Sequence, residues 1–227
     1  MPERPIIFSG PMVRAILAGT KMQTRRVVQP QPPAGHAWAG WCVASTQRAD
    51  EGKATWGAGS LPHLRAAHRV ACRYGRPGDR LWVREAWRVG RKHDGTKPSD
   101  LSPRSMTVEY EAGGYACNSP WSAGEWQSSD CAPREHPEWV GKLRPPIHMP
   151  RWASRITLEV TGVRVERLQD VSAADFWAEG IEHSPDVDPV HEYSDLWRSI
   201  YGPGSWASNP WVWVVEFQRV DSEARQP

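Results

Sequence analysis

A lysine, a threonine hydroxyl and two guanidinium groups stand close together in residues 19–26, whose sequence is GTKMQTRR. If residues 22–28 form an extended strand, Thr24 and Arg26 point to one face of it, and the long stem of Lys21 reaches the same space. An amine acts as general base for a hydroxyl nucleophile when burial or cationic neighbours lower the pKa of the amine. The segment therefore favours a Thr24 nucleophile activated by Lys21. The alternative is that these basic residues only form a solvated surface after a helix.

Two other segments place charged groups on predicted elements. Arg84 and Glu85 are adjacent on a predicted strand and point to opposite faces of it, which suits either a site or an ion pair that anchors neighbouring strands. Glu179 lies at a predicted helix C-terminus, where the helix dipole disfavours a carboxylate. We therefore expect Glu179 to have a partner, such as a lysine that it orients or an amino group that it binds. The alternative is a surface glutamate before a capping glycine.

Three short helices are predicted from capping residues and apolar spacing. The first covers about residues 11–18 and stops at Gly19. The second opens with a capping box formed by Ser172 and Asp175. The third ends at Gly202 and carries apolar residues on one face, at the spacing i, i+3, i+4 and i+7. These residues are Tyr193, Leu196, Trp197 and Ile200.

Alternating apolar and polar residues predict strands between the helices. The predicted strands cover residues 5–8, 80–84, 106–110, 156–165 (with a break at Thr161-Gly162) and 211–217. Strands outnumber helices and do not alternate with them regularly, which argues against a doubly wound parallel sheet. The predicted fold class is therefore α+β, with a small mixed β-barrel and short flanking helices.

A single domain is predicted over residues 1–227, with two long loop insertions at about 30–75 and 113–150. Both stretches lack a sustained period and are rich in Trp, Pro and Gly. The chain has 14 tryptophans, which either stack on bases or anchor loops to a core. Because large apolar groups are seldom left exposed, we expect the insertions to be mostly irregular and to lie over the barrel. The residues expected to hold them are Trp38, Trp41, Trp121 and Trp126.

The composition narrows the classes of protein that fit. The net charge of +2 is too balanced to require a nucleic-acid partner and too mild to exclude one. The apolar stretches run only a few residues and no secretory signal opens the chain, so we expect a cytoplasmic protein with no membrane partner. The four cysteines form no CxxC pair and no histidine lies at zinc-finger spacing from one. We therefore expect neither a metal nor a cofactor.

Three motifs, in order along the chain, resemble those of the ASCH domain family, whose members have a PUA-like barrel. Residues 16–26 (ILAGTKMQTRR) look like the opening signature of the family. Residues 78–83 (GDRLWV) resemble its next element and residues 178–181 (AEGI) resemble its third. Three further segments look like ASCH-like proteins encoded in phages and prophages, namely residues 80–87, 147–155 and 210–217. The resemblance covers most of the chain outside the two insertions.

The resemblance implies a pocket for a nucleoside, a nucleotide or RNA. Small bacterial relatives are amidohydrolases that remove the acetyl group from N4-acetylcytidine, and their catalytic residues correspond to Lys21, Thr24 and Glu179. The residues expected to bind substrate are Arg26 (also a candidate oxyanion contact), Arg84, Trp82 and Trp152, either tryptophan stacking on the base. Binding of RNA or a nucleotide without catalysis and ribonuclease activity are the alternatives, because other relatives bind RNA or have been linked to its cleavage.

Overall fold

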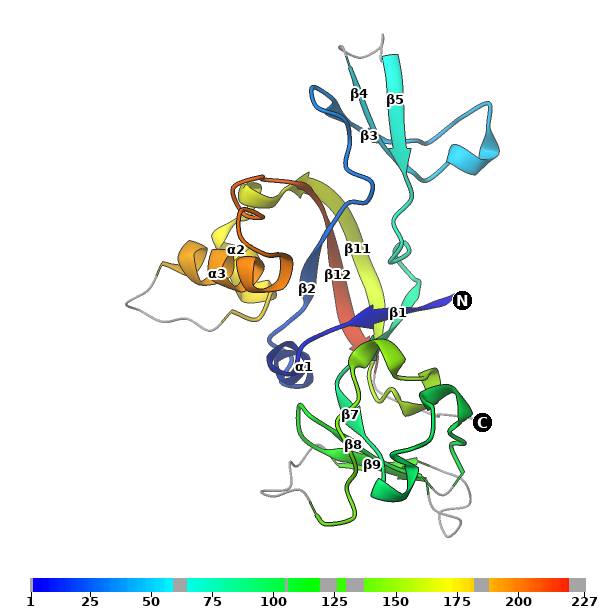
Figure 1. Ribbon diagram of the computed structural model, residues 1–227. Coiled ribbons are helices and arrows are strands. Elements are labelled where there is room, and N and C mark those ends of the chain that lie inside the picture. Colours follow the sequence, from blue (N-terminus) through cyan, green and yellow to red (C-terminus); the bar gives the residue numbers. More distant parts are fainter. Residues whose placement is uncertain are drawn as a thin grey trace. The chain divides into compact units, whose positions relative to one another are not determined.

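The computed structural model describes residues 2–58, 65–104, 106–118, 126–129, 137–181 and 188–220 (Figure 1). The protein is a mixed α+β structure in which strands outnumber α-helices, as the sequence predicts. Among the described residues the strands form sheets and no closed barrel is detected. The chain divides into two compact units. Unit 1 comprises residues 1–21, 78–160 and 217–227, and unit 2 comprises residues 22–77 and 161–216.

Among the residues that the structure describes, unit 1 contains one α-helix, α1 (Gly10–Leu17), and the strands β1 (Glu3–Ile7), β6 (Arg80–Arg84), β7 (Trp87–Arg88), β8 (Thr107–Tyr110), β9 (Tyr115–Asn118) and β10 (Trp126–Ser129). Its short 3-10 helices are η2 (Arg91–His93), η3 (Pro98–Asp100), η5 (Pro146–His148) and η6 (Arg151–Ala153). Two long strands, β11 (Thr157–Arg167) and β12 (Trp211–Val220), each contribute residues to both units.

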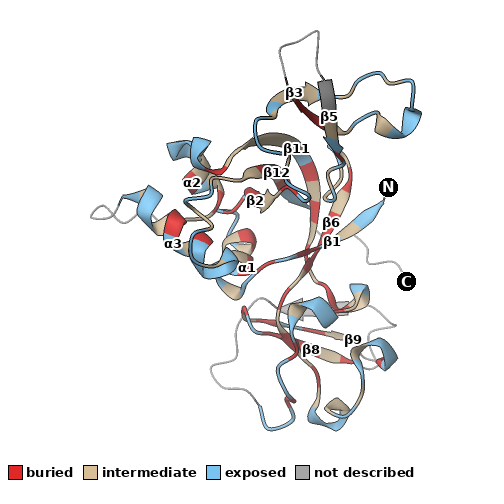
Figure 2. Cartoon of the chain, turned by 45° about the horizontal axis from the view of Figure 1, so that its top comes forward, coloured by how far each residue is buried: buried red, intermediate tan, exposed pale blue. Residues whose placement is uncertain are grey.

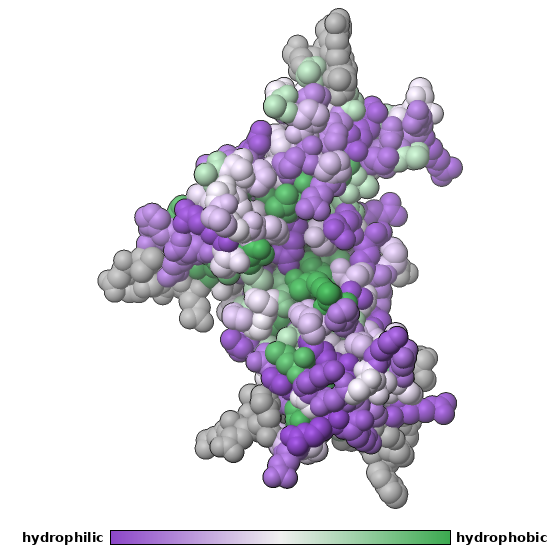
Figure 3. Space-filling view, viewed as in Figure 1, coloured by the Kyte–Doolittle hydropathy of each residue, from purple (hydrophilic) through white to green (hydrophobic). Residues whose placement is uncertain are grey.

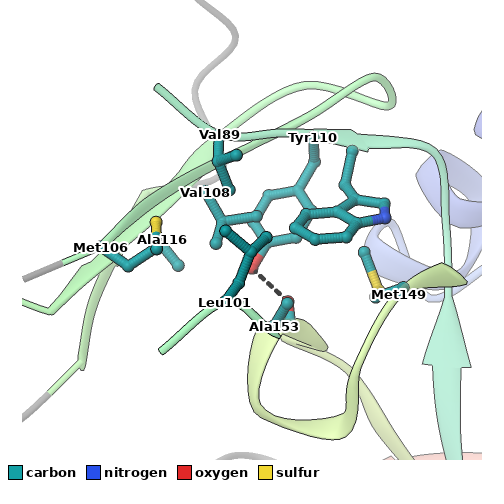
Figure 4. Close-up of a cluster of buried hydrophobic side chains, with 9 residues drawn as sticks. Val89, Leu101, Met106, Val108, Tyr110, Ala116, Met149 and Ala153 are labelled. Atoms are coloured by element: carbon teal, nitrogen blue, oxygen red, sulfur yellow. Dashed lines mark hydrogen bonds between the residues drawn. The ribbon is translucent and has the colours of Figure 1, made fainter. Parts of the chain in front are cut away.

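Two sheets order the strands of unit 1. In the first, β6 pairs in parallel with β1 and antiparallel with β11, and the buried Leu81 lies opposite Leu158. Figure 2 shows β1 and β6 side by side, with buried residues along β6. The second is an antiparallel sheet in the order β7-β8-β9-β10. Its core is a cluster of buried apolar side chains around Trp87 and Tyr110, and the Tyr110 hydroxyl donates a 2.8 Å hydrogen bond to the carbonyl of Ala153 (Figure 4). A buried phenol that finds an acceptor adds apolar area without an unpaired polar atom.

Helix α1 follows from its sequence signals. Pro11 stands in the first turn, where its missing N–H costs no hydrogen bond. Val13 and Ile16 are buried on one face. Gly19 has a φ of 76°, the left-handed conformation that closes a helix and favours glycine. The helix predicted over 11–18 is therefore confirmed, and its end delivers Lys21.

Unit 2 contains β2 (Gln23–Val27), β3 (Ala37–Trp41), β4 (Ala54–Ala58), β5 (Arg65–Val70), α2 (Ala173–Ala178) and α3 (Pro189–Tyr201), with 3-10 helices η1 (Arg48–Asp50) and η7 (Leu168–Asp170). Strand β12 lies between β11 and β2, and it runs antiparallel to β2 with Val214 opposite Arg25. The capping box of Ser172 and Asp175 opens α2, and α3 ends before Gly202 at a φ of 89°, as predicted.

The first predicted insertion is not a loop. Strands β3, β4 and β5 form a three-stranded antiparallel sheet within residues 30–75. Trp38 packs edge-on against Trp56 at 5.2 Å between ring centroids, and Trp41 stacks on Trp213 at 6.0 Å. The expectation that Trp38 and Trp41 anchor this segment is supported by these contacts, whereas the expectation of irregular chain is wrong.

The second predicted insertion also carries regular structure, because β9 and β10 lie within residues 113–150. Trp121 and the side chain of Trp126 lie outside the described residues. The break predicted at Thr161-Gly162 is wrong as well, since β11 is continuous there. A Cβ on Gly162 would collide with the Glu216 carboxylate. The glycine therefore allows the Glu216 side chain to lie close to the backbone of β11, and it does not interrupt the strand.

Within the described part of the chain, none of the helices has both the length and the apolar character needed to cross a membrane. On the face shown in Figure 3, apolar residues form small areas among hydrophilic ones.

Candidate active site on β2 and α2

Strand β2 sends its functional side chains to two opposite faces. On one face, the Gln23 amide donates to Asp175 Oδ1 at 2.9 Å, and Arg25 Nη2 lies 3.1 Å from Asp175 Oδ2. On the other face, Arg26 Nη1 donates to Thr24 Oγ1 at 2.8 Å. The period of two along a strand explains the division. The expectation that Thr24 and Arg26 share a face is confirmed, and Gln23 and Arg25 face helix α2.

Arg25 is the centre of a buried charge cluster. Its side chain is fully enclosed, and it donates from Nε to Glu166 Oε1 at 2.9 Å and from Nη1 to Glu179 Oε1 at 3.2 Å. A guanidinium presents donors in a fixed fork, which allows one buried cation to satisfy several carboxylates. Burial alone would lower the pKa of Arg25, but the nearby Tyr193, Glu179 and Glu166 raise it above its usual value. Arg25 therefore stays charged.

A second guanidinium joins the same carboxylates. Arg164 donates from Nε to Glu166 Oε2 at 3.0 Å and from Nη2 to Asp175 Oδ1 at 2.6 Å, and its Nη1 pairs with Glu216. Among the described residues of this cluster, the four carboxylates of Glu166, Asp175, Glu179 and Glu216 thus share two guanidiniums. Each of the two guanidiniums therefore bridges three of these carboxylates.

Helix α2 positions two of these carboxylates. Asp175 is the third residue of the helix, and Glu179 caps it four residues later, so that both lie on the face toward β2. Burial alone would raise the pKa of Asp175, but hydrogen bonds from Ser172 and Gln23 and the charge of Arg25 hold it well below its usual value. The predicted need of Glu179 for a partner is confirmed. That partner includes Arg25, which the sequence reasoning did not pair with it.

Tyr193 on α3 lies close to this cluster. Its side chain is buried, and both burial and the Glu179 carboxylate raise the pKa of the phenol well above its usual value. The hydroxyl therefore stays protonated and can act as a donor, not as a base, near neutral pH.

Lys21 belongs to unit 1, whereas Thr24 and Glu179 belong to unit 2. Lys21 is only 3% exposed, and its Nζ lies 5.8 Å from the centroid of the Phe8 ring. Its backbone N–H donates to the Ala15 carbonyl at 3.1 Å, which ties it to the end of α1. The meeting of Lys21 with Thr24 and Glu179 stays a prediction.

The other predicted substrate contacts lie in unit 1. The guanidinium carbon of Arg84 lies 4.5 Å from the centroid of the buried Trp82 ring. Trp152 packs edge-on against Trp87 at 6.3 Å. Arg84 also donates to the Ile147 carbonyl at 3.2 Å. These residues have packing partners of their own, and their roles toward a substrate stay predictions.

Glu85, the neighbour of Arg84 in the sequence, pairs with Arg155. Glu85 is buried and accepts from Arg155 Nε at 2.9 Å and Nη2 at 3.0 Å. Arg155 also lies over the Tyr110 ring, 4.1 Å from its centroid. This bidentate pair matches the strand-anchoring alternative considered for Glu85.

Sequence reasoning missed Glu166, Asp175 and Arg164 as members of the site. Arg164 and Glu166 are two residues apart in the segment VRVER, and this spacing could have predicted that their side chains share one face of a strand. Asp175 was recognised only as a helix cap.

Among the described residues, no group of three or more histidine, cysteine or acidic side chains could hold a metal ion. No model of a known protein family, no curated protein and no solved structure matches the chain.

Proposed function

We propose that this protein is a cytoplasmic hydrolase that removes an acyl group from a modified cytidine-type nucleoside or nucleotide, on a PUA-like fold of the ASCH kind. The observation that carries the proposal is the 2.8 Å hydrogen bond from Arg26 Nη1 to the buried Thr24 Oγ1. A guanidinium donor stabilises an oxygen on which negative charge develops. Thr24 is thereby a hydroxyl prepared for attack, and the resemblance supplies the reaction.

In the proposed reaction, Lys21 Nζ takes the proton of the Thr24 hydroxyl while Oγ1 attacks the amide carbonyl carbon of the substrate. The C–N bond then breaks, and the exocyclic nitrogen leaves as an amine with the proton from Lys21. Water hydrolyses the resulting Thr24 ester and releases the acid. Arg26 stabilises the oxyanion in both halves of the reaction. Lys21 and Thr24 are three peptide steps apart, which is a span of at most about 11 Å.

Glu179 acts in this proposal as the residue that holds Lys21 or the exocyclic nitrogen. Support comes from the position of Glu179 at the end of α2, where its Oε1 accepts from Arg25 on the same strand that carries Thr24. Trp82 or Trp152 stacks on the base and Arg84 contacts the substrate in the same proposal.

The test is the hydrolysis of N4-acetylcytidine by the purified full chain, followed as cytidine and acetate by mass spectrometry. Thr24→Ala and Lys21→Arg should each reduce kcat by several orders of magnitude, because nucleophile and base act as one unit. Lys21→Arg retains the positive charge, but a guanidinium cannot take a proton near neutral pH. Thr20→Ala and Lys142→Arg are matched controls at exposed positions and should retain full activity.

Full activity of Lys21→Arg would exclude Lys21 as the base. If the unsubstituted protein turns over no acylated cytidine but binds short RNA with a strong salt dependence, the RNA-binding alternative replaces the hydrolase. Cleavage of that RNA would instead indicate a ribonuclease.

A further inference from the structure

An open cavity of about 460 Å³ lies in unit 1, and its lining includes none of the residues proposed for hydrolysis. Its volume falls within the range of about 300–1,000 Å³ that is usual for small-molecule sites. The cavity is formed where β7 leads into η2, beside the start of β8 and the residues before Val140. Its lining residues are Gly90, Arg91, Lys92, His93, Met106, Thr107, Glu138 and Trp139.

The loop that carries the basic residues is fixed by a buried arginine. Arg144 is 4% exposed and donates from Nη2 to the His93 carbonyl at 2.6 Å and from Nη1 to the Thr96 carbonyl at 3.1 Å. Asp94 Oδ1 accepts from the backbone N–H of Lys142 at 2.9 Å. Because these hydrogen bonds already order the loop, binding of a ligand to it costs little additional conformational entropy.

Three cationic or donor side chains follow one another on this fixed loop. Arg91 and Lys92 are exposed, and His93 is half-buried with ring nitrogens that can donate. Among the described residues, neither Arg91 nor Lys92 has an ion-pair partner. All three residues line the cavity, and cationic side chains around one cavity suit a group with several acceptor oxygens, such as a phosphate ester.

An indole lines the same cavity. Trp139 is 46% exposed, and its carbonyl accepts from the Arg91 backbone N–H at 2.7 Å, which fixes its backbone beside the basic loop. An exposed indole on a held backbone offers a flat face for stacking, and stacking is tolerant of the identity of the base. Glu138 and Thr107 line the same cavity, and side chains of these types can accept from ribose hydroxyls.

We propose that this cavity binds a 5′-phosphorylated nucleotide, with the base on Trp139 and the phosphate at Arg91, Lys92 and His93. The nucleotide is either free or the 5′ end of a strand, since both present the same ring and phosphate ester. The lining shares no residue with the site proposed for hydrolysis, so Thr24→Ala should bind the nucleotide as the unsubstituted chain does.

Isothermal titration calorimetry on the full chain tests this, with adenosine 5′-monophosphate as the probe because the proposed hydrolysis selects cytidine. Adenosine alone and inorganic phosphate should each bind at least about tenfold more weakly than the nucleotide. Trp139→Ala should weaken binding about tenfold or more, and Trp139→Phe should restore most of it. A 5′-phosphorylated triadenylate, run in parallel, distinguishes a free nucleotide from a strand end by which of the two binds more tightly.

Lys92→Gln should weaken binding about threefold to tenfold and flatten its salt dependence. Lys97→Gln, at an exposed position five residues further on, and Tyr115→Ala, at an exposed ring of β9, should leave binding unchanged. Absence of nucleotide binding at millimolar concentration overturns the proposal. So does binding that persists undiminished in both Trp139→Ala and Lys92→Gln.

Discussion

Asp175 links β2 to α2 through its ionised form, and this makes the stability of the protein dependent on pH. Hydrogen bonds from Ser172 and Gln23 and the charge of Arg25 overcome the effect of burial and hold its pKa well below the usual value. A carboxylate with a lowered folded-state pKa contributes stability that is fully present above its ordinary pKa, about 3.9. That contribution is lost as the pH falls from there through the folded-state pKa.

Asp175→Asn should therefore lower the free energy of unfolding by about 2 kcal/mol at neutral pH, since it removes charge-assisted hydrogen bonds. The difference from the unsubstituted chain should shrink as the pH falls below about 4, where the carboxylate of the unfolded chain becomes protonated while that of the folded chain stays charged. Urea titrations across this pH range measure it. Asp195→Asn, on an exposed carboxylate of α3, is the control and should show no such dependence. A difference that stays constant with pH would contradict the assignment.

At the same scale, sequence reasoning could predict faces but not neighbours. The period of two placed Thr24 with Arg26, and the helix dipole indicated that Glu179 needs a partner. Neither rule says which distant residue lies opposite. Arg25 and Glu166 are separated by 141 positions, and only the pairing of strands and the packing of α2 bring such residues together.

Gly141 shows how closely the elements of unit 1 approach one another. A Cβ at this position would collide with Asp94 Oδ1 and lie 2.8 Å from the backbone carbonyl oxygen of Val89. The Asp94 side chain can turn away, but the Val89 carbonyl belongs to a fixed backbone that accepts from the Gly141 N–H at 2.8 Å. Gly141→Ala should lower the free energy of unfolding by about 1–3 kcal/mol, as overpacking does.

Gly95→Ala is the matched control for Gly141→Ala. A Cβ at Gly95 meets nothing within 4 Å, and its φ lies outside the range that strains other residues. Thermal unfolding of both variants should show a lower midpoint for Gly141→Ala alone. An equal midpoint for the two alanine variants would mean that the backbone at Val89 gives way readily.

The helices and strands differ in how well the sequence predicts them. Caps and stop signals predicted α1, α2 and α3, because each signal corresponds to a backbone group that a helix end must satisfy. The strands β3 and β4 escaped prediction because their pairing shifts register between Trp38 and Gly40, and β4 and β5 shift between Trp56 and Ala58. Each irregularity breaks the alternation that marks a strand in a sequence.

At the scale of the whole molecule, neither unit is a continuous piece of chain. The chain passes from one unit to the other four times, and two of these passages fall inside β11 and β12. In unit 1, β11 is held to β6 by the pairing of Thr157–Glu159 with Arg80–Trp82. In unit 2, β12 is held to β2 along Val212–Glu216. A strand that loses its pairing in one unit therefore frays toward the other.

We accordingly expect the two units to unfold in one cooperative transition. Gly141→Ala, which lies in unit 1, should accelerate amide hydrogen exchange in β2 of unit 2 by the same factor as in β8 of unit 1. For a loss of about 1.4 kcal/mol, that factor is about tenfold. Native-state hydrogen exchange on the full chain measures both strands at once, with Gly95→Ala as the reference. Acceleration confined to β8 would show instead that each unit opens on its own and that β11 and β12 transmit no loss of stability between them.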